Sequence, residues 1–329
     1  MVRRIVVCLL TTALLSIAPF VEAQQTGKIP RIGHVSGSGN ANNPEPSVQA
    51  FRQGLRDLGY IEGKNILVEY RSAEGKLDRA PALVAELVQL KVDVLVTAFL
   101  PGIRAAKEAT KTIPIVFVTG VDPVATGIVD SLARPGGNIT GLTTLARELS
   151  GKRLELLKEV VPKVSRVGVL WDANAEAPAI SFKEYESAAR SLKIPLQSLE
   201  VRGPNVDLDG AFRTAAKGRV NALIAISNPV LSRYAKRLAE LAIKNRLPSM
   251  YERSQYVETG GLMSYSSNVA ESYRRAATYV DKILKGAKPA DLPVEQPMKF
   301  EFVINLKAAK QIGLTIPPNV LVRADRVIR

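Results

Sequence analysis

The chain has 329 residues, of which 46% are hydrophobic, so it can bury two ordinary cores and we expect two domains. Its formal net charge is +14, but basic residues never run longer than two and acidic residues lie among them, which favours a solvated basic surface over a nucleic-acid site. The single cysteine, Cys8, lies near the start, which excludes disulfides, iron–sulfur clusters and zinc–thiolate sites in the rest of the chain.

The first 23 residues have the pattern of a secretory signal peptide. Arg3 and Arg4 precede an uncharged, mostly apolar run over residues 5–21, and Ala23 stands at the expected cleavage position. The run is 17 residues long and interrupted by polar residues, so it is shorter than the roughly 20 residues that a spanning helix needs. Cys8 lies inside the run rather than after it, which argues against a lipid anchor. We therefore expect residues 1–23 to be removed and the protein to be periplasmic, soluble and not lipid-anchored.

Short apolar runs alternate along the chain with longer segments of helical periodicity, as in parallel strands that helices bury on both faces. Val48, Phe51 and Leu55 recur at helical spacing before Gly59, and residues 269–284 carry a second apolar stripe. The pattern predicts an α/β fold of repeated strand–helix–strand units. The runs assigned to strands are residues 32–35, 66–70, 92–97, 115–119, 167–171, 196–201, 222–227 and 262–265.

The two halves of the chain repeat the same order of elements. Residues 90–96 parallel residues 217–224, and residues 105–116 parallel residues 238–250, so each half contains a helix end that leads into a buried strand. Duplication of such a unit gives two lobes with a cleft between them. We expect an N-terminal lobe of residues 27–142 plus 264–297, and a C-terminal lobe of residues 143–263 plus 298–329. Several crossings between lobes permit hinge closure.

Longer motifs in this sequence resemble one known family. Residues 58–65 read LGYIEGKN and are followed by VEYR, residues 131–141 read SLARPGGNITG, residues 260–265 read GGLMSY, and residues 283–297 read ILKGAKPADLPVEQP. This set is similar to the substrate-binding components of bacterial ABC importers of the tryptophan and tyrosine uptake type. The resemblance implies two Rossmann-like lobes in the type I periplasmic-binding-protein fold. The sequence departs from the family's usual pattern at residues 99–101 and at Ser266, both near the presumed cleft.

Candidate ligand-binding residues follow the ends of predicted strands, because ligands collect beyond the carboxyl ends of strands in open α/β sheets. Ser36 opens a run over residues 36–42 that is rich in small donors. Thr97 and Thr119 end two strands and could hold a carboxylate, and Asp122 could pair with an ammonium group. The predicted ligand-binding residues are Ser36, Thr97, Thr119, Asp122, Asn174, Asn228 and Tyr256.

Structural roles compete with these assignments. Asp122 precedes Pro123, and such a turn needs no ligand; Tyr256 could be a stacking surface or a core residue. The only histidine, His34, is more typical of a packed side chain than of a catalytic base. Residues 37–39 read GSG but lack the third glycine of a dinucleotide motif, and no residues have metal-ligand spacing. We expect no catalytic residues, no metal and no cofactor.

These observations favour a solute-binding component of an ABC importer that closes its interlobe cleft on an amino acid or related small organic solute. The resemblance implies a permease and its ATPase as partners. We expect a monomer and no nucleic-acid partner. The alternative that folding brings separate basic residues into one cluster stays open. Two alternatives also stay open: a sensor of the same fold that signals to a membrane receptor, and an exported hydrolase.

Overall fold

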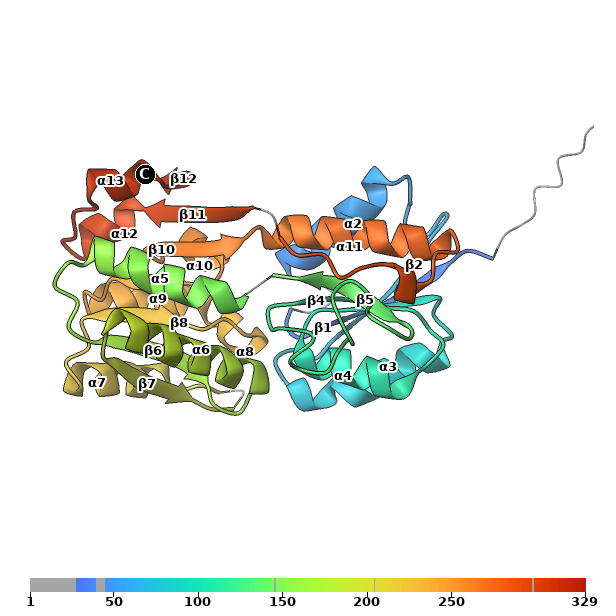
Figure 1. Ribbon diagram of the computed structural model, residues 1–329, viewed down its shortest axis with the longest axis horizontal. Coiled ribbons are helices and arrows are strands. Elements are labelled where there is room, and N and C mark those ends of the chain that lie inside the picture. The colour runs from blue at the N-terminus through green and yellow to red at the C-terminus, as the bar shows by residue number, and fades with distance from the viewer. Residues whose placement is uncertain (1–27, 40–44, 145, 204, 298) are drawn as a thin grey trace, which may run out of the picture.

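The computed structural model describes residues 28–39, 45–144, 146–203, 205–297 and 299–329. The predicted signal peptide and residues 40–42 of the polar run lie outside the described residues. The described residues form two α/β lobes that lie side by side along the long axis of the molecule (Figure 1). The predicted fold class is confirmed.

The first lobe is built on a parallel sheet with strand order β2-β1-β3-β4-β5. Successive side chains of a strand point to opposite faces, so Val116 and Val118 of β4 pack under α2 and α11, whereas Ile115 and Phe117 pack under α3 and α4 (Figure 1). The elements are β1 (Arg31–Ser36), α2 (Pro46–Asp57), β2 (Leu67–Ser72), η1 (Leu77–Arg79), α3 (Ala80–Gln89), β3 (Val94–Thr97), α4 (Leu100–Ala109), β4 (Ile115–Thr119), β5 (Ile139–Thr143), α11 (Val269–Leu284) and η2 (Pro289–Asp291).

The second lobe has the strand order β12-β11-β10-β9-β8-β6-β7, in which only the β10–β11 pair is antiparallel among the described strands. Helices α5, α6, α12 and α13 cover one face, and α7, α9 and α10 cover the other. The elements are α5 (Ala146–Val160), β6 (Val167–Asp172), α6 (Glu176–Leu192), β7 (Leu196–Val201), α7 (Leu208–Lys217), β8 (Ala222–Ala225), α8 (Pro229–Ser232), α9 (Ala235–Lys244), β9 (Ser249–Tyr251), α10 (Ser254–Glu258), β10 (Met263–Ser267), β11 (Phe300–Asn305), α12 (Leu306–Gln311), α13 (Pro318–Leu321) and β12 (Arg326–Ile328).

Three stretches connect the described parts of the two lobes, between β5 and α5, between β10 and α11, and between η2 and β11 (Figure 1). The first and third lie side by side, because Thr143 N donates to Glu295 O at 2.9 Å and Glu295 N donates to Gly141 O at 3.1 Å. The predicted lobe boundary at residue 264 is wrong in one respect. It falls inside β10, which pairs with β9 and β11, so Ser264 to Ser267 belong to the second sheet. The rest of the predicted division stays a proposal.

Each of the eight predicted apolar runs overlaps a strand, but four strands are not predicted from the sequence. The sequence of β5, ITGLT, is interrupted by glycine and threonine, and β9 is only three residues long. The continuous apolar run of β11 is only three residues long, residues 302–304, and β12 is a short edge strand of three residues. These strands lack the continuous apolar run on which the prediction depends. The two predicted helices are confirmed as α2 and α11.

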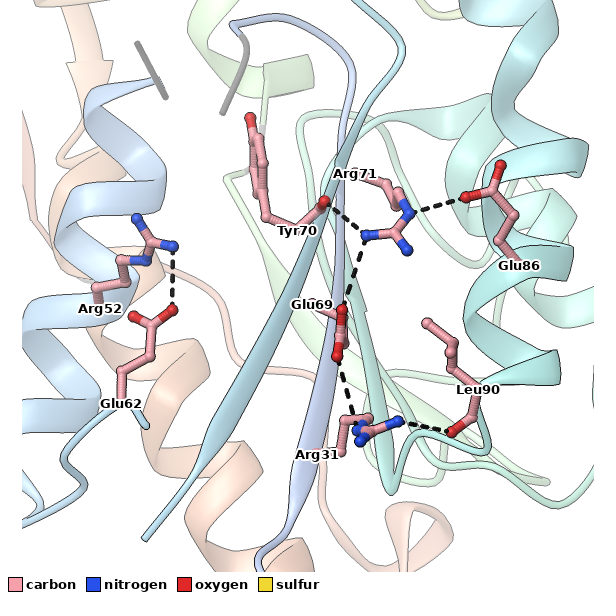
Figure 2. Close-up of polar contacts among 8 residues, drawn as sticks. All are labelled: Arg31, Arg52, Glu62, Glu69, Tyr70, Arg71, Glu86 and Leu90. Carbon is pink, nitrogen blue, oxygen red and sulfur yellow. Dashed lines mark hydrogen bonds and ion pairs between the residues drawn. The ribbon is translucent and has the colours of Figure 1, made fainter. Parts of the chain in front are cut away.

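The edge strand β2 carries charged side chains that connect it to its neighbours. Figure 2 shows Glu69 of β2 between Arg31 and Arg71, with Nε of Arg71 2.8 Å from Oε2 of Glu86 on α3. On the other side of the strand, Arg52 of α2 pairs with Glu62 (Figure 2). Charged side chains on an edge strand oppose pairing with a second molecule. Because these pairs are partly exposed, each contributes little to stability.

Candidate ligand-binding site

A cavity of about 420 Å³ lies between the two lobes, within the range of ordinary small-molecule sites. It is formed where the carboxyl ends of strands from both sheets face each other, as in other open α/β proteins. The first lobe contributes Ser36, Gly37, Glu45, Leu77, Asp78, Ala98, Phe99, Leu100, Pro101, Val118, Thr119, Gly120, Val121 and Thr144. The remaining lining residues are Leu149, Arg153, Asn174, Ala175, Glu176, Ala177, Pro178, Ser181, Ser227, Asn228, Pro229, Ser232, Glu252, Arg253, Ser266, Ser267, Val269 and Tyr273.

The end of β1 brings the two lobes into direct contact. A Cβ atom on Gly37 would lie 2.5 Å from Cγ of Pro229, which opens α8 in the second lobe, so a larger residue would separate the two. Next to it, Ser36 Oγ donates to Ser38 O at 2.7 Å. At the end of β4, Thr119 Oγ1 accepts from Val121 N at 3.3 Å. The first lobe therefore offers hydroxyl groups and backbone at the cavity.

A network around β6 fixes part of the second lobe's wall. Asn228 Nδ2 donates to Asp172 Oδ2 at 2.8 Å, while Asn228 Oδ1 accepts from Leu231 N at 2.7 Å and caps α8. The other carboxylate oxygen of Asp172 accepts from Asn174 N at 3.0 Å. Both the nitrogen and the oxygen of the Asn228 side-chain amide are thus engaged in hydrogen bonds within the wall. The side chain of Asn174 has no hydrogen-bond partner among the described residues and is available to a ligand.

A buried arginine lies at the cavity on the side of α5 and α6. Arg153 is 2% exposed; its Nε donates to Tyr265 O at 2.7 Å, and its Nη1 lies 3.1 Å from Tyr185 Oη and 3.3 Å from Glu252 Oε1. Glu252 Oε2 also accepts from Ser227 N at 2.8 Å. Burial alone would lower the pKa of Arg153, but the adjacent Tyr185 and Glu252 raise it, so the guanidinium stays protonated. The network holds β9, β10 and α6 together beneath the cavity.

Two further charges line the cavity from opposite lobes. Glu45 occupies the N-cap position of α2 without a side-chain capping hydrogen bond, and Arg253 precedes α10. Burial raises the pKa of Glu45 above its usual range, although Arg253 and a hydrogen bond from Ser47 Oγ lower it. Within the described parts of the chain, neither Glu45 nor Arg253 forms an ion pair.

The two lobes are closed over the cavity. Arg104 Nη2 of α4 lies 2.6 Å from Glu176 Oε1 of α6, and Arg233 Nη1 donates to Glu74 O at 2.9 Å. Ala177, at the start of α6, packs against the first-lobe core cluster that contains Phe99. These contacts join elements of opposite lobes, so opening the cleft would break them.

Four of the seven predicted ligand-binding residues line the cavity: Ser36, Thr119, Asn174 and Asn228. Thr97 is buried behind the wall, and its Oγ1 has no hydrogen-bond partner in the described chain. Asp122 does not line the cavity; its Oδ1 accepts from Val124 N at 2.9 Å and Ala125 N at 3.0 Å, which is the turn geometry considered as its alternative role. Tyr256 is buried and stacks on Tyr251 at a centroid distance of 5.1 Å, as a core residue does.

Sequence reasoning missed the charged residues of the cavity. Arg153 lies within a helix, where no strand end marks it, and Glu252 and Arg253 follow β9, which was not recognised as a strand. Glu45 precedes Pro46, and a proline after a candidate cap is a signal for a helix start that could have identified it. The stretch 99–101 and Ser266, where the sequence departs from the family pattern, both line the cavity.

The only histidine is a core residue. His34 is 1% exposed and lies against Phe51 and Tyr70, with ring-centroid distances of 5.5 and 5.7 Å. Burial and the charge of Arg52 lower the pKa of His34 to about 4, so it is neutral at pH 7. No group of three or more histidine, cysteine or acidic side chains in the described residues could hold a metal ion. None of the described helices is long and apolar enough to span a membrane.

Comparisons with known proteins agree with this geometry. A family model described as "ABC transporter substrate binding protein" matches residues 41–328. The chain is similar to a tyrosine-binding protein of Clostridioides difficile (strain R20291), with 24% identity over 269 residues that cover 81% of this chain and 76% of that protein. Two solved structures are also similar. A conserved domain protein from Vibrio cholerae has 31% identity and a TM-score of 0.83, covering 91% of this chain and all of that one.

The second structure is an ABC domain from Streptococcus pneumonia in complex with L-Trp. It has 24% identity and a TM-score of 0.81, covering 92% of this chain and 100% of that chain. The two-lobed architecture is that of type I periplasmic binding proteins. The family and the fold are those of solute-binding proteins rather than enzymes.

Proposed function

Because the chain belongs to the family of ABC transporter substrate-binding proteins, we propose that it binds an amino acid in the interlobe cavity and delivers it to a permease. Members of this family bind small solutes and work with ABC transporter permeases. The observation that carries the proposal is the cavity of about 420 Å³, which residues of both lobes enclose. A ligand that contacts both walls stabilises the closed form and shifts the population toward it.

The two flanks of the cavity suit an amino acid with a large apolar side chain. At the starts of α4 and α6, Phe99, Leu100 and Pro178 form an apolar flank. Near the start of α2 and the end of β9, Glu45 and Arg253 form a charged flank. The names of two relatives, a tyrosine-binding protein and an ABC domain in complex with L-Trp, support an aromatic amino acid. Ser36, Thr119 and Asn174 would supply hydrogen bonds.

We also propose where in the cell the protein binds and delivers its solute. Residues 1–23 direct export, the closed protein delivers its solute from the periplasm, and a separate ATPase drives the permease. The protein acts as a monomer. Export can be checked by mass spectrometry of the periplasmic fraction, in which the N-terminal peptide should begin at Gln24; a chain that keeps residues 1–23 would contradict this part of the proposal.

The ligand class is tested by thermal unfolding of the purified protein with each of the twenty amino acids. A ligand that binds only the folded state adds about 2.7 kcal/mol of stability at a concentration of 100 Kd. We expect the largest rise in Tm with L-tryptophan or L-tyrosine. Glucose and benzoate serve as matched probes of other solute classes. Stabilisation by one of these and by no amino acid would refute the proposed ligand class.

A further inference from the structure

The charged residues of the cavity fall into paired and unpaired groups. Arg153 is neutralised by Glu252, and Glu176 pairs with Arg104 at the rim. Of the remaining lining charges, Asp78 is exposed on η1, whereas Glu45 and Arg253 are both partly buried. A partly buried charge without a partner has lost part of its hydration and has gained no counter-charge. Glu45 and Arg253 are therefore the two charges in the wall that a ligand can pair with.

Glu45 is held in place by the first lobe. It precedes α2, its backbone carbonyl accepts the first hydrogen bonds of that helix from Val48 N and Gln49 N, and Ser47 Oγ donates to its Oε2 at 3.1 Å. Ser36 also forms a side-chain hydrogen bond with this carboxylate. A carboxylate offers about four lone-pair sites, so these two bonds leave acceptor sites for a ligand. Tyr273 of α11 also lines this part of the cavity. A carboxylate fixed in this way can accept from an ammonium group without reorganising.

Arg253 belongs to the second lobe. It follows β9 directly after Glu252, whose carboxylate is already occupied by Arg153 and the backbone of Ser227. The guanidinium of Arg253 has no hydrogen-bond acceptor among the described residues, although its charge acts on both Glu45 and Tyr273. Arg253 is therefore close enough to Glu45 for its charge to lower the pKa of that carboxyl group. No direct ion pair joins the two residues in the described chain.

We propose that Glu45 and Arg253 form a split recognition site for a zwitterion, in which Glu45 binds the ammonium group of an α-amino acid and Arg253 binds its carboxylate. The inference rests on the proposed function and specifies its ligand chemistry. The two groups come from opposite lobes, so one zwitterion links both lobes through charge-assisted hydrogen bonds. An amine or a carboxylic acid alone engages one lobe only, so the pair selects complete amino acids and couples their binding to closure.

The test uses ligands that each lack one of the two charged groups. The probes are L-tyrosine, tyramine and 3-(4-hydroxyphenyl)propionate, with L-tryptophan, tryptamine and indole-3-propionate as a second set. Their Kd values are measured by isothermal titration calorimetry on the full protein and on the isosteric variants Glu45→Gln and Arg253→Gln. The unaltered protein should bind each amino acid about 10- to 100-fold more tightly than either of its analogues.

The two variants should lose affinity for different probes. Glu45→Gln should weaken the amino acid and the amine about 10- to 100-fold and leave the carboxylic acid unchanged. Arg253→Gln should weaken the amino acid and the carboxylic acid to the same extent and leave the amine unchanged. The control Arg237→Gln removes an exposed arginine paired with Asp209 on the second lobe and should change no Kd.

Three results would overturn an assignment. If both variants weaken all probes equally, the two residues stabilise closure and do not recognise the charges of the ligand. If both variants keep the affinity for the amino acid, Glu45 and Arg253 are not part of the site. If the unaltered protein binds neither amino acid, the proposed aromatic ligand fails and the zwitterion assignment fails with it. Equal Tm values of the variants and the control verify that the variants are folded.

Discussion

The two lobes build their sides of the cavity from different kinds of groups. The first lobe presents hydroxyls and backbone at strand ends, chiefly Ser36 and Thr119, with Glu45 as its partly buried charge. The second lobe places a buried guanidinium, that of Arg153, beneath its wall together with the carboxylate of Glu252. The first wall therefore depends chiefly on where strands end, whereas the second adds charged side chains that a helix and a short strand bring together.

The lobes also differ in how they bury an ionisable side chain. His34 of β1 has no hydrogen-bond partner for either ring nitrogen among the described residues, and burial keeps it neutral. Arg153 is equally buried but stays charged, because Glu252, Tyr185 and the carbonyl of Tyr265 surround it. The first lobe keeps its buried side chain, His34, neutral, whereas the second lobe keeps Arg153 charged and pairs it with a carboxylate. The two solutions predict different responses to mutation and to pH.

Removal of the buried charge from the second lobe should have the largest effect. Arg153→Met deletes the cation but leaves Glu252 and Tyr185 buried, and an uncompensated buried charge of this kind costs about 3–5 kcal/mol. We expect urea unfolding to show a loss of that size in the free energy of unfolding.

The neighbouring residue supplies the control for this variant. Lys152 is exposed and pairs with Glu155 only three residues away on α5, so Lys152→Met should change the free energy of unfolding by less than about 0.5 kcal/mol. Arg153→Lys keeps the charge but cannot reproduce all three contacts and should fall between the two. A loss below 1 kcal/mol for Arg153→Met would mean that the network is not what holds β9, β10 and α6 together.

Acid should destabilise the first lobe through His34. Its pKa is about 4 in the folded protein and about 6.5 in the unfolded chain, so between these values the unfolded state binds more protons. The stability present at neutral pH is therefore lost as the pH falls through 6.5, and the loss is complete below about 4. Between pH 7 and pH 5 the expected loss from this group is about 2 kcal/mol.

The contribution of His34 is isolated by comparing two pH profiles. His34→Leu removes the titrating group and keeps an apolar side chain between Phe51 and Tyr70. The free energy of unfolding of this variant should lack the loss of about 2 kcal/mol between pH 7 and pH 5. Parallel profiles for the two proteins would mean that the pKa of His34 does not change on folding, which would contradict this prediction.

The sequence predicts the strand-end residues of the site, on both lobes, better than it predicts the charged residues, for a physical reason. Strand ends are visible as the ends of apolar runs, so Ser36, Thr119, Asn174 and Asn228 are found by applying one rule about open α/β sheets. The rule names positions but not side-chain directions. Thr97 and Asp122 also lie at or just after strand ends. The side chain of Thr97 lies behind the wall, and that of Asp122 accepts a hydrogen bond from Val124 N within its own loop.

The charged residues could not be found in this way. Arg153 is one basic residue among many on a helix, and only the packing of α5 against β10 shows that it is buried. Glu252 and Arg253 follow a strand of three residues, too short to be distinguished from a loop by periodicity. Long, continuously apolar strands and amphipathic helices are thus predictable from local pattern, whereas contacts between distant segments are not.

The contact between the lobes at Gly37 should be sensitive to a single methyl group. In Gly37→Ala the new Cβ would lie 2.5 Å from Pro229 and 3.2 Å from Phe99. Because Pro229 belongs to the other lobe, we expect the cleft to open slightly rather than the first lobe to deform. Overpacking of this kind costs 1–3 kcal/mol, so the affinity for an amino acid should fall about 10-fold or more while Tm in the absence of ligand changes little. Gly151→Ala is the control, because its Cβ would have an ordinary contact of 3.9 Å with Ala188.

The smallest expected effect is at the rim, where Arg104 of the first lobe meets Glu176 of the second. Both side chains are nearly half exposed, at 45% and 49%, and such a pair contributes only about 0.2–1 kcal/mol to closure. Arg104→Gln should therefore weaken amino-acid binding no more than about fivefold at low ionic strength, and 1 M salt should abolish the difference because it screens exposed charges. Arg237→Gln, whose partner Asp209 is in the same lobe, should leave affinity unchanged at either salt concentration. A loss above tenfold, or one that persists in 1 M salt, would mean that the rim pair carries the closure that we assign to the ligand and the buried wall.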